Sequence, residues 1–392
     1  MKAVFSASGR LSLGAALMAL ALSVSGPLGA EERAPLPAHV IERFGEPPAI
    51  PDGPLPTALQ QAMRTVFVDS VSQAVWGKDQ RDALELIVQS DDPRLVWVIS
   101  DMMRFTWRQQ FDDALADAAA SLLEIELRTP QRWGEITDYL IAWDIPSYPG
   151  YLDTKRAIFT NFVPGWDRLF VEGEIDWRLV SWGGVLIDDR AYDTTDEPCN
   201  CIPAADNPPV TSAEDATWLA DDDVVFGIEV NGEYRAYPRQ IMEVREMVND
   251  TLGGRDLGIP YCTLCGAAQA YFTDEVPEGV ARPVLRTSGL LIRSNKVMYD
   301  VETYSVFDTF LGTAVTGPLQ GLQLKQATVI TSDWGAWKEA HPNTTVLVEE
   351  LALGRDFDFR NGRDANGPIF PVGDVDPRLP VHEDIIGVIT AS

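Results

Sequence analysis

Histidine and cysteine are both scarce in this chain of 392 residues, which contains three histidines and four cysteines. His39 lies in a proline-rich lead-in, His341 precedes a proline in a predicted turn, and His382 lies in the terminal stretch. Mechanisms of the Ser-His-Asp or Cys-His type require a histidine beside the nucleophile. The sequence therefore gives little support to hydrolase chemistry.

Basic side chains are also few, since 31 lysines and arginines stand against 59 acidic residues and give a net charge of -28. Proteins that bind nucleic acid need basic surfaces that release counterions from phosphate, and anionic membrane surfaces also attract basic segments. We therefore expect neither type of partner. The acidic surface is most simply explained by solubility.

The N-terminus carries one apolar stretch, from Leu11 to Val24, behind the basic residues Lys2 and Arg10. It is short for a membrane span, and the small residue Ala30 offers a cleavage point before an acidic, proline-rich stretch. We predict a signal peptide over residues 1–30, with an uncleaved anchor as the alternative. The mature protein is expected to be periplasmic or secreted, without stable membrane insertion.

Hydrophobic periodicity predicts an α+β protein with a helical N-terminal region of helical-repeat-like hairpins and a mostly β C-terminal domain. Residues 31–56 form an extended lead-in, and residues 57–135 are helical, with apolar residues recurring every three or four positions around Leu84 and Val98. Asp92 and Pro93 are typical of a helix start. Residues 136–198 are rich in tryptophan, proline and glycine and are predicted to form an irregular connecting layer.

Residues 199–392 are predicted to form the mainly β domain. Asn231-Gly232 indicates a hairpin after a strand over 224–230. Pro238 is predicted to open a helix that continues through Val248 and ends at Gly253-Gly254. Further strands are expected over 284–292 and 322–330. Residues 384–389 echo residues 223–228, which predicts either a terminal edge strand or a truncated sequence.

All four cysteines lie in this β domain, as Cys199-x-Cys201 and as Cys262-Thr263-Leu264-Cys265-Gly266. The second motif lies between two predicted strands, which favours a strand-turn-strand metal knuckle with backbone amides pointing at the sulfurs over a thioredoxin-like helix start.

The four thiols could supply the ligands of a closed zinc site, and copper(I) accepts two or three thiolates with a methionine such as Met298. Disulfides are the alternative in an oxidising compartment, with three connectivities open. A redox-active thiol pair is the third interpretation.

Several motifs in the β domain follow one another in the order typical of a bacterial family. They comprise Gly227-Ile228-Glu229-Val230-Asn231-Gly232-Glu233, Glu246-Met247-Val248-Asn249-Asp250, Tyr261-Cys262-Thr263-Leu264-Cys265-Gly266, Ser288-Gly289-Leu290-Leu291 and Met298-Tyr299-Asp300. With these motifs, residues 202–347 resemble the domain of unknown function numbered three-one-seven-nine. The helical region lies outside the resemblance.

The resemblance implies an exported protein with a thiol pair at its centre and implies no particular activity. The sequence departs from the family pattern at Arg245, where a histidine is usual, and at Thr263, where proline is common. An arginine would more naturally hold an anion or a carboxylate. Around the thiols we expect a surrounding layer of side chains, consisting of Arg245, Glu246, Asn249, Tyr299 and Asp300.

Two functional hypotheses follow from the sequence. In the first, Cys262 and Cys265 bind a soft metal, zinc or copper, or cycle between thiol and disulfide. In the second, the protein is a non-catalytic interaction module whose cysteines form structural disulfides and whose helical region binds a protein partner. The sequence assigns no substrate and does not decide whether the protein is an enzyme.

Overall fold

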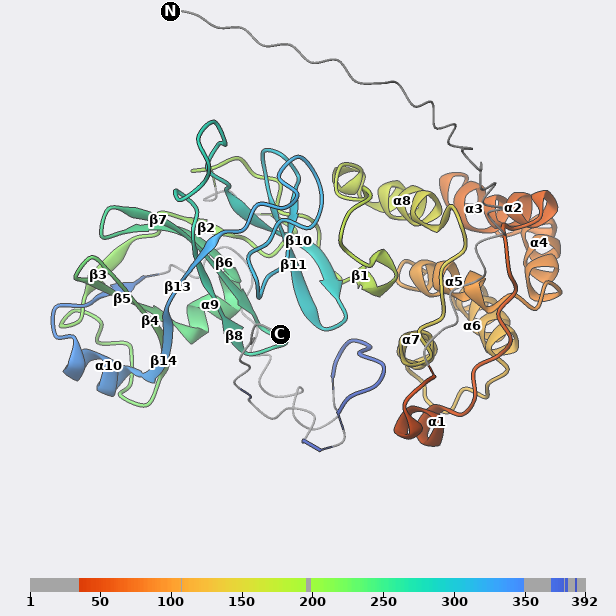
Figure 1. The fold of residues 1–392 in the computed structure, drawn as a ribbon, viewed down its shortest axis with the longest axis horizontal. Coiled ribbons are helices and arrows are strands. Elements are labelled where there is room, and N and C mark those ends of the chain that lie inside the picture. The colour runs from red at the N-terminus through yellow and green to blue at the C-terminus, as the bar shows by residue number, and fades with distance from the viewer. Residues whose placement is uncertain are drawn as a thin grey trace, which may run out of the picture. The chain divides into compact units, whose positions relative to one another are not determined.

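Helices occupy the first part of the described chain and strands most of the remainder, which confirms the predicted α+β class (Figure 1). The computed structural model describes residues 35–106, 108–194, 199–348, 368–376, 378–379 and 385. The predicted signal peptide and His382 lie outside these ranges. Within them, no helix combines the length and apolar character that a membrane crossing requires. The described residues from Pro37 onward cluster as one compact unit.

The helical region is built around α5, which packs against α6, α7 and α8. All residues of α5 are buried, and its sequence is apolar on nearly every side, as expected for a helix enclosed by others. The Asp92 carboxylate accepts the Arg94 N–H at 3.1 Å, which confirms the predicted start. The helices of this region are α1 (Ala38–Phe44), α2 (Thr57–Arg64), α3 (Ser70–Ser72), α4 (Lys78–Val88), α5 (Val96–Met103), α6 (Gln109–Leu123), α7 (Arg132–Ala142) and α8 (Tyr151–Phe162).

The aromatic segment is more regular than predicted, because α7 and α8 lie largely or wholly within it. The prediction of an irregular connecting layer is wrong for these residues. Pro149 and Gly150 lie just before α8, and Pro164 follows its end. Proline and glycine at such positions mark helix ends rather than prevent a helix.

The β region contains three sheets with the strand orders β1-β10-β11-β12, β13-β9-β7-β6-β2 and β14-β4-β5-β15-β3, and β8 also pairs with β7. Two helices, α9 (Arg239–Arg245) and α10 (Trp334–Ala340), lie between strands along the chain. The strands are β1 (Val180–Trp182), β2 (Ala205–Asp206), β3 (Val210–Ser212), β4 (Val224–Val230), β5 (Glu233–Pro238), β6 (Met247–Leu252), β7 (Arg255–Cys262), β8 (Ala267–Ala268), β9 (Ala270–Phe272), β10 (Leu285–Ile292), β11 (Asn295–Asp300), β12 (Val306–Phe307), β13 (Lys325–Ala327), β14 (Val329–Asp333) and β15 (Thr345–Leu347).

Two predicted elements of the β region are corrected by the structure. The helix that opens after Pro238 ends at Arg245, because Glu246 adopts a left-handed conformation with φ of 51°. Met247 then begins β6, so Gly253-Gly254 forms a strand-to-strand turn and not a helix end. The strand predicted over 322–330 divides into β13 and β14, which belong to different sheets. The echo over 384–389 lies outside the described residues except for Ile385, which is in no strand.

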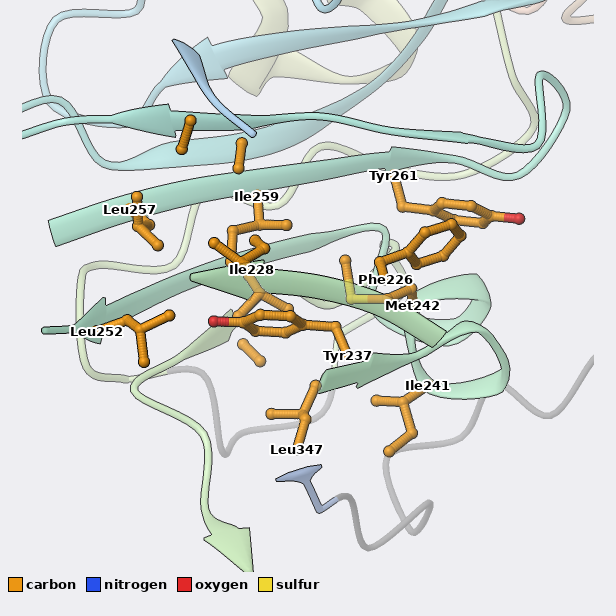
Figure 2. Close-up of a cluster of buried hydrophobic side chains, with 14 of the residues drawn as sticks. Phe226, Ile228, Tyr237, Ile241, Met242, Leu252, Leu257, Ile259, Tyr261 and Leu347 are labelled. Atoms are coloured by element: carbon orange, nitrogen blue, oxygen red, sulfur yellow. The ribbon is translucent and has the colours of Figure 1, made fainter. Parts of the chain in front are cut away.

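A hydrophobic core between β4, β5, α9 and β7 supports the cysteine motif (Figure 2). Tyr261, the residue before Cys262, is fully buried in this core, and its ring lies 5.3 Å from that of Phe226. Tyr237 and Ile259 belong to the same cluster. The strand that ends at Cys262 is therefore fixed by packing up to its final residues.

A buried ion pair joins the helical region to the first strand. Lys155 on α8 has no exposed surface, and its ammonium donates to the Asp101 carboxylate of α5 at 2.5 Å and to the Val180 carbonyl of β1 at 2.6 Å. Tyr151 donates to the same carboxylate at 2.8 Å. Burial lowers the pKa of Lys155 and raises the pKa of Asp101. The pair is thus satisfied geometrically but costly to desolvate.

Replacing only one partner of this pair is expected to destabilise the fold strongly. The Asp101→Ala variant leaves a buried ammonium without its carboxylate, and we expect a loss of about 3–5 kcal/mol in the free energy of unfolding. The double variant Asp101→Leu/Lys155→Met removes both charges and is expected to lose less. Urea unfolding followed by circular dichroism measures both. A double variant less stable than Asp101→Ala would contradict the assignment.

Candidate functional site

The Cys262/Cys265 motif forms the turn between β7 and β8. Cys262 ends β7 and pairs with Ala267 in an antiparallel ladder. The N–H groups of Cys265 and Gly266 donate to the Cys262 carbonyl at 3.1 and 2.9 Å. Gly266 has φ of 66°, a conformation that glycine adopts without strain. The strand-turn-strand prediction is confirmed. The expectation that these amides point at the sulfurs is wrong, because they donate to a carbonyl.

Both thiols of the motif are free, with Cys262 buried and Cys265 half-buried. Their sulfurs lie 3.7 and 3.6 Å from the carbonyl oxygen of Ser294, and the sulfur of Cys265 lies 3.5 Å from Oδ1 of Asn295. The Cys265 thiol and the backbone N–H of Lys296 also lie beside the Cys262 sulfur, and both lower the pKa of Cys262. The hairpin between β10 and β11 therefore forms the opposite wall of the thiol site.

A buried carboxylate and ammonium lie directly beneath the turn. The Lys296 ammonium donates to the Glu246 carbonyl oxygen and lies 3.4 Å from the Glu246 carboxylate. Thr263, between the two cysteines, donates its hydroxyl to the same carboxylate at 2.6 Å. Glu246 also accepts the Tyr261 N–H at 2.9 Å through its carbonyl. The cysteine turn is thereby fixed to α9 and β11 at once.

The two thiols have opposite pKa shifts. Burial and the Glu246 carboxylate raise the pKa of Cys262, but the contact with Cys265 together with the backbone N–H and the charge of Lys296 lowers it below its usual value. The pKa of Cys265 is raised well above its usual value, first by its hydrogen bond to Cys262 and then by burial. The pair therefore gives up its first proton from Cys262, and Cys265 holds its proton more tightly.

Cys262 borders a mainly apolar cavity of ≈ 90 Å³. Glu246 and Lys296 supply its charged lining, and Leu290 of β10 is one of its apolar residues. Gly289 on the same wall has φ of 74°, and a side chain there would collide with the Val185 carbonyl at 2.4 Å. Glycine at this position keeps the β10 backbone close to the segment that carries Val185. The cavity places the cysteine with the lowered pKa next to space for a small apolar group.

Of the surrounding residues that the sequence suggested, Glu246 lies at the thiols, whereas Met298 does not line the cavity. Met298 is fully buried in a separate hydrophobic cluster with Met247 and Phe307. Arg245 is buried and its guanidinium lies 3.4 Å from the Pro203 carbonyl.

The side chains of the remaining three predicted residues form hydrogen bonds within the β region. The Asn249 amide contacts Asp206 at 2.9 Å. The Tyr299 hydroxyl donates to the Asp188 carbonyl at 2.7 Å. The Asp300 carboxylate accepts the Val284 N–H at 2.8 Å.

The other two cysteines, Cys199 and Cys201, form a disulfide with each other. This pairing overturns the expectation of a four-thiolate zinc site, because a disulfide offers no thiolate to a metal. The Asp188 carboxylate lies close to both sulfurs, and potential ligand atoms of Asp188, Cys199 and Cys201 all fall within 4.8 Å of one another. This group could hold a metal ion, and thiolate coordination there would require the disulfide to be reduced.

Buried charges hold the disulfide segment, residues 199–206, against β10. Arg286 has no exposed surface and makes a double contact with Asp206 at 2.8 and 2.5 Å. Asp188 is equally buried, accepts the Arg190 side chain at 2.7 Å and accepts the Ala204 N–H at 2.9 Å. Ile202, which directly follows Cys201 in this segment, lines the cavity beside Cys262.

The two histidines within the described ranges lie away from the cysteine turn. His39 contacts Asp374 at 2.6 Å. His341 stacks on Tyr234 with ring centroids 4.2 Å apart and also contacts Trp337. Both have structural neighbours that explain their positions.

Sequence reasoning missed Lys296 and Asp188. Lys296 directly precedes the apolar residues Val297 and Met298 in β11, and a charge at a buried strand position is the signal that could have identified it. Asp188 has a weaker signal, since it lies in an acidic and basic run with Asp189 and Arg190.

The fold and the site define an α+β protein in which a free Cys-x-x-Cys pair occupies a hairpin turn above a buried ion pair. Residues 199–392 match the model of the family described as "Protein of unknown function (DUF3179)", and this part of the chain belongs to that family. The resemblance noted in the sequence is thereby confirmed. No curated protein and no solved structure matches the chain.

Lys296 is expected to keep the pKa of Cys262 low. In the Lys296→Met variant the ammonium is lost and the pKa of Cys262 should rise, because a nearby positive charge favours the thiolate. The ultraviolet absorbance of the thiolate, followed against pH in reduced protein, measures this change. Lys325→Met is the matched control, because Lys325 pairs with Glu275 on the surface. An unchanged titration of Cys262 in Lys296→Met would contradict the assigned role.

Proposed function

We propose that this chain is an exported thiol–disulfide redox protein in which Cys262 is the nucleophile and Cys265 the resolving thiol. The observation that carries the proposal is the opposite pKa shift of two adjacent free thiols, with the lower pKa on the cysteine that borders the cavity. The thiolate is the attacking species in thiol–disulfide exchange. A lowered pKa increases the fraction of Cys262 that is thiolate, which favours Cys262 as the attacking sulfur.

The exchange uses only the two thiols and a disulfide substrate. The Cys262 thiolate attacks one sulfur of the substrate, forming a mixed disulfide and releasing the other substrate sulfur as a thiolate. Cys265 then gives up its proton and attacks the Cys262 sulfur, which releases the second substrate thiolate. Two electrons pass from the cysteine pair to the substrate, and a Cys262–Cys265 disulfide remains. The reverse sequence oxidises a substrate dithiol.

Several features support export and disfavour a closed metal site at the motif. The N-terminal sequence has the features of a secretory signal, and the Cys199–Cys201 disulfide suits an oxidising compartment. In the described part of the chain, the candidate metal-holding group of histidine, cysteine and acidic residues is the one at Asp188, not one at Cys262.

Single cysteine variants should separate the two roles. In Cys265→Ser, a mixed disulfide formed through Cys262 cannot be resolved, so it should accumulate with a model disulfide such as oxidised glutathione. Cys262→Ser should form much less adduct, because the cavity is bordered by Cys262 and not by Cys265, and burial still raises the pKa of Cys265. Mass spectrometry of the intact protein measures the adducts. Equal adduct formation in the two variants would sink the proposal.

A second candidate function, metal binding, is favoured by the Asp188, Cys199 and Cys201 group. In protein reduced and purified without oxygen, zinc or copper(I) held by this group should be lost in Cys199→Ser/Cys201→Ser and retained in Cys262→Ser/Cys265→Ser. Elemental analysis decides between the two pairs. Retention in both variants contradicts binding by either pair. If Cys262→Ser/Cys265→Ser loses only folding stability, the interaction-module hypothesis gains support over both.

A further inference from the structure

A C-terminal segment reaches back to the thiol site, and we define residues 368–374, Pro-Ile-Phe-Pro-Val-Gly-Asp, as the strap. Ile369 and Phe370 line the cavity that Cys262 borders. The Phe370 carbonyl accepts the Ser294 hydroxyl at 3.1 Å. Ser294 is the same residue whose carbonyl oxygen lies beside both thiols. The strap is therefore bonded to the wall of the thiol site.

The helical region provides the other half of the strap's binding surface. The Arg104 guanidinium lies over the rings of Trp133 and Phe370, at 4.2 and 5.3 Å from their centroids. Arg104 is itself fixed by two hydrogen bonds to the Trp182 carbonyl of β1, at 2.9 and 2.7 Å. Phe370 also meets Trp133 edge to face at 6.0 Å. An aromatic side chain of the strap is thus held between the two regions.

A single carboxylate fixes the far end of the strap. One oxygen of Asp138, on α7, accepts the N–H groups of Val372 and Gly373 at 3.0 and 2.8 Å. Gly373 has φ of 70°, and a Cβ there would lie 2.4 Å from Ile141, so glycine alone fits this close approach. Hydrogen bonds from backbone amides to a carboxylate are stronger than those between neutral groups. Asp138 is therefore a positioning residue for the strap.

The strap has the properties of a bound peptide. Pro368 and Pro371 favour an extended backbone and reduce the entropy lost on docking. Between them stand two apolar residues, of which Ile369 is 49% exposed although it also lines the cavity. Large apolar side chains at a partly open site indicate that the site accepts apolar chain segments.

We propose that the strap is an intramolecular occupant of the substrate path, and that the dithiol acts on cysteines in extended, proline-containing apolar polypeptide segments that displace it. The statement about substrates rests on the proposed redox function of Cys262. Undocking of the strap exposes Cys262, and docking protects it. Because a peptide and the strap compete for one surface, substrate binding and strap release are coupled.

The first test is the rate at which iodoacetamide alkylates Cys262 in the reduced full-length protein, followed by peptide mass spectrometry. Asp138→Ala removes both N–H contacts of the strap, and we expect alkylation to be roughly tenfold faster, equivalent to about 1.4 kcal/mol of docking free energy. Glu135→Ala is the matched control, since Glu135 lies on the same helix and contacts Arg128 and Thr129. It should leave the rate unchanged.

Phe370→Ala weakens the strap from its other end and should also accelerate alkylation, so the test does not depend on Asp138 alone. Thermal unfolding confirms that each variant remains folded. Rates in Asp138→Ala and Phe370→Ala equal to that of the unmodified protein would overturn the proposal, as would an equal acceleration in Glu135→Ala.

The second test uses a synthetic peptide of residues 368–374 and a control peptide with serine at the positions of Ile369 and Phe370. Added to Asp138→Ala, the first peptide should slow alkylation of Cys262 and the control should not. Equal effects of the two peptides would overturn the assignment of substrate class. If Asp138→Ala and Phe370→Ala accelerate alkylation of Cys262 but Cys265→Ser forms no mixed disulfide, the proposed redox function is wrong and the proposed role of the strap is supported. If alkylation is unchanged in these variants but Cys265→Ser accumulates the mixed disulfide, the proposed role of the strap is wrong and the redox function is supported.

Discussion

The buried contact between Glu246 and Lys296 is the constraint on which the rest of the thiol site depends. Glu246 ends α9, its carbonyl receives the Tyr261 N–H and the Lys296 ammonium, and its carboxylate receives the Thr263 hydroxyl. One residue thereby fixes a helix end, a strand and the cysteine turn in a common geometry. Because a buried carboxylate without a partner costs several kcal/mol, this arrangement has few alternatives of similar free energy.

The disulfide segment is held by contacts that do not involve its sulfurs. The Thr287 hydroxyl donates to the Ile202 carbonyl at 2.7 Å, and Asp188 accepts the Ala204 N–H. Arg286 fixes Asp206 further along the same segment. Reduction of Cys199–Cys201 therefore leaves the Ile202 wall of the cavity anchored. The two cysteine pairs can change redox state separately although they belong to neighbouring parts of one domain.

Local patterns predicted the strand that ends at Cys262, the hairpin at Asn231 and the helical start at Asp92, because neighbours in sequence decide each of them. Prediction failed where contacts between residues far apart in the sequence decide the local structure. The segment after Arg245 carries a helical apolar pattern, but Glu246 turns left-handed and Met247 pairs with Pro260 in a sheet. Lys296 meets Glu246 across fifty positions of the chain. Met298 was assigned to the thiols because it is near them in the order of motifs, yet tertiary packing places it in a separate core cluster.

The charge balance around Cys262 decides between the two chemistries that a Cys-x-x-Cys turn can support. A metal site of two thiolates must accommodate a cation and deprotonate both sulfurs, and the negative charge of a second thiolate would lie beside the first in a buried space. Here the contact with Cys262 and burial raise the pKa of Cys265, and the Lys296 ammonium that lowers the pKa of Cys262 also lies beside the Glu246 carboxylate. With a Cys262 thiolate, the Glu246 carboxylate and the Lys296 ammonium, the buried turn carries one net negative charge. The site therefore resists loss of the second proton, which disfavours a metal site that needs both sulfurs deprotonated and supports a single reactive thiol at Cys262.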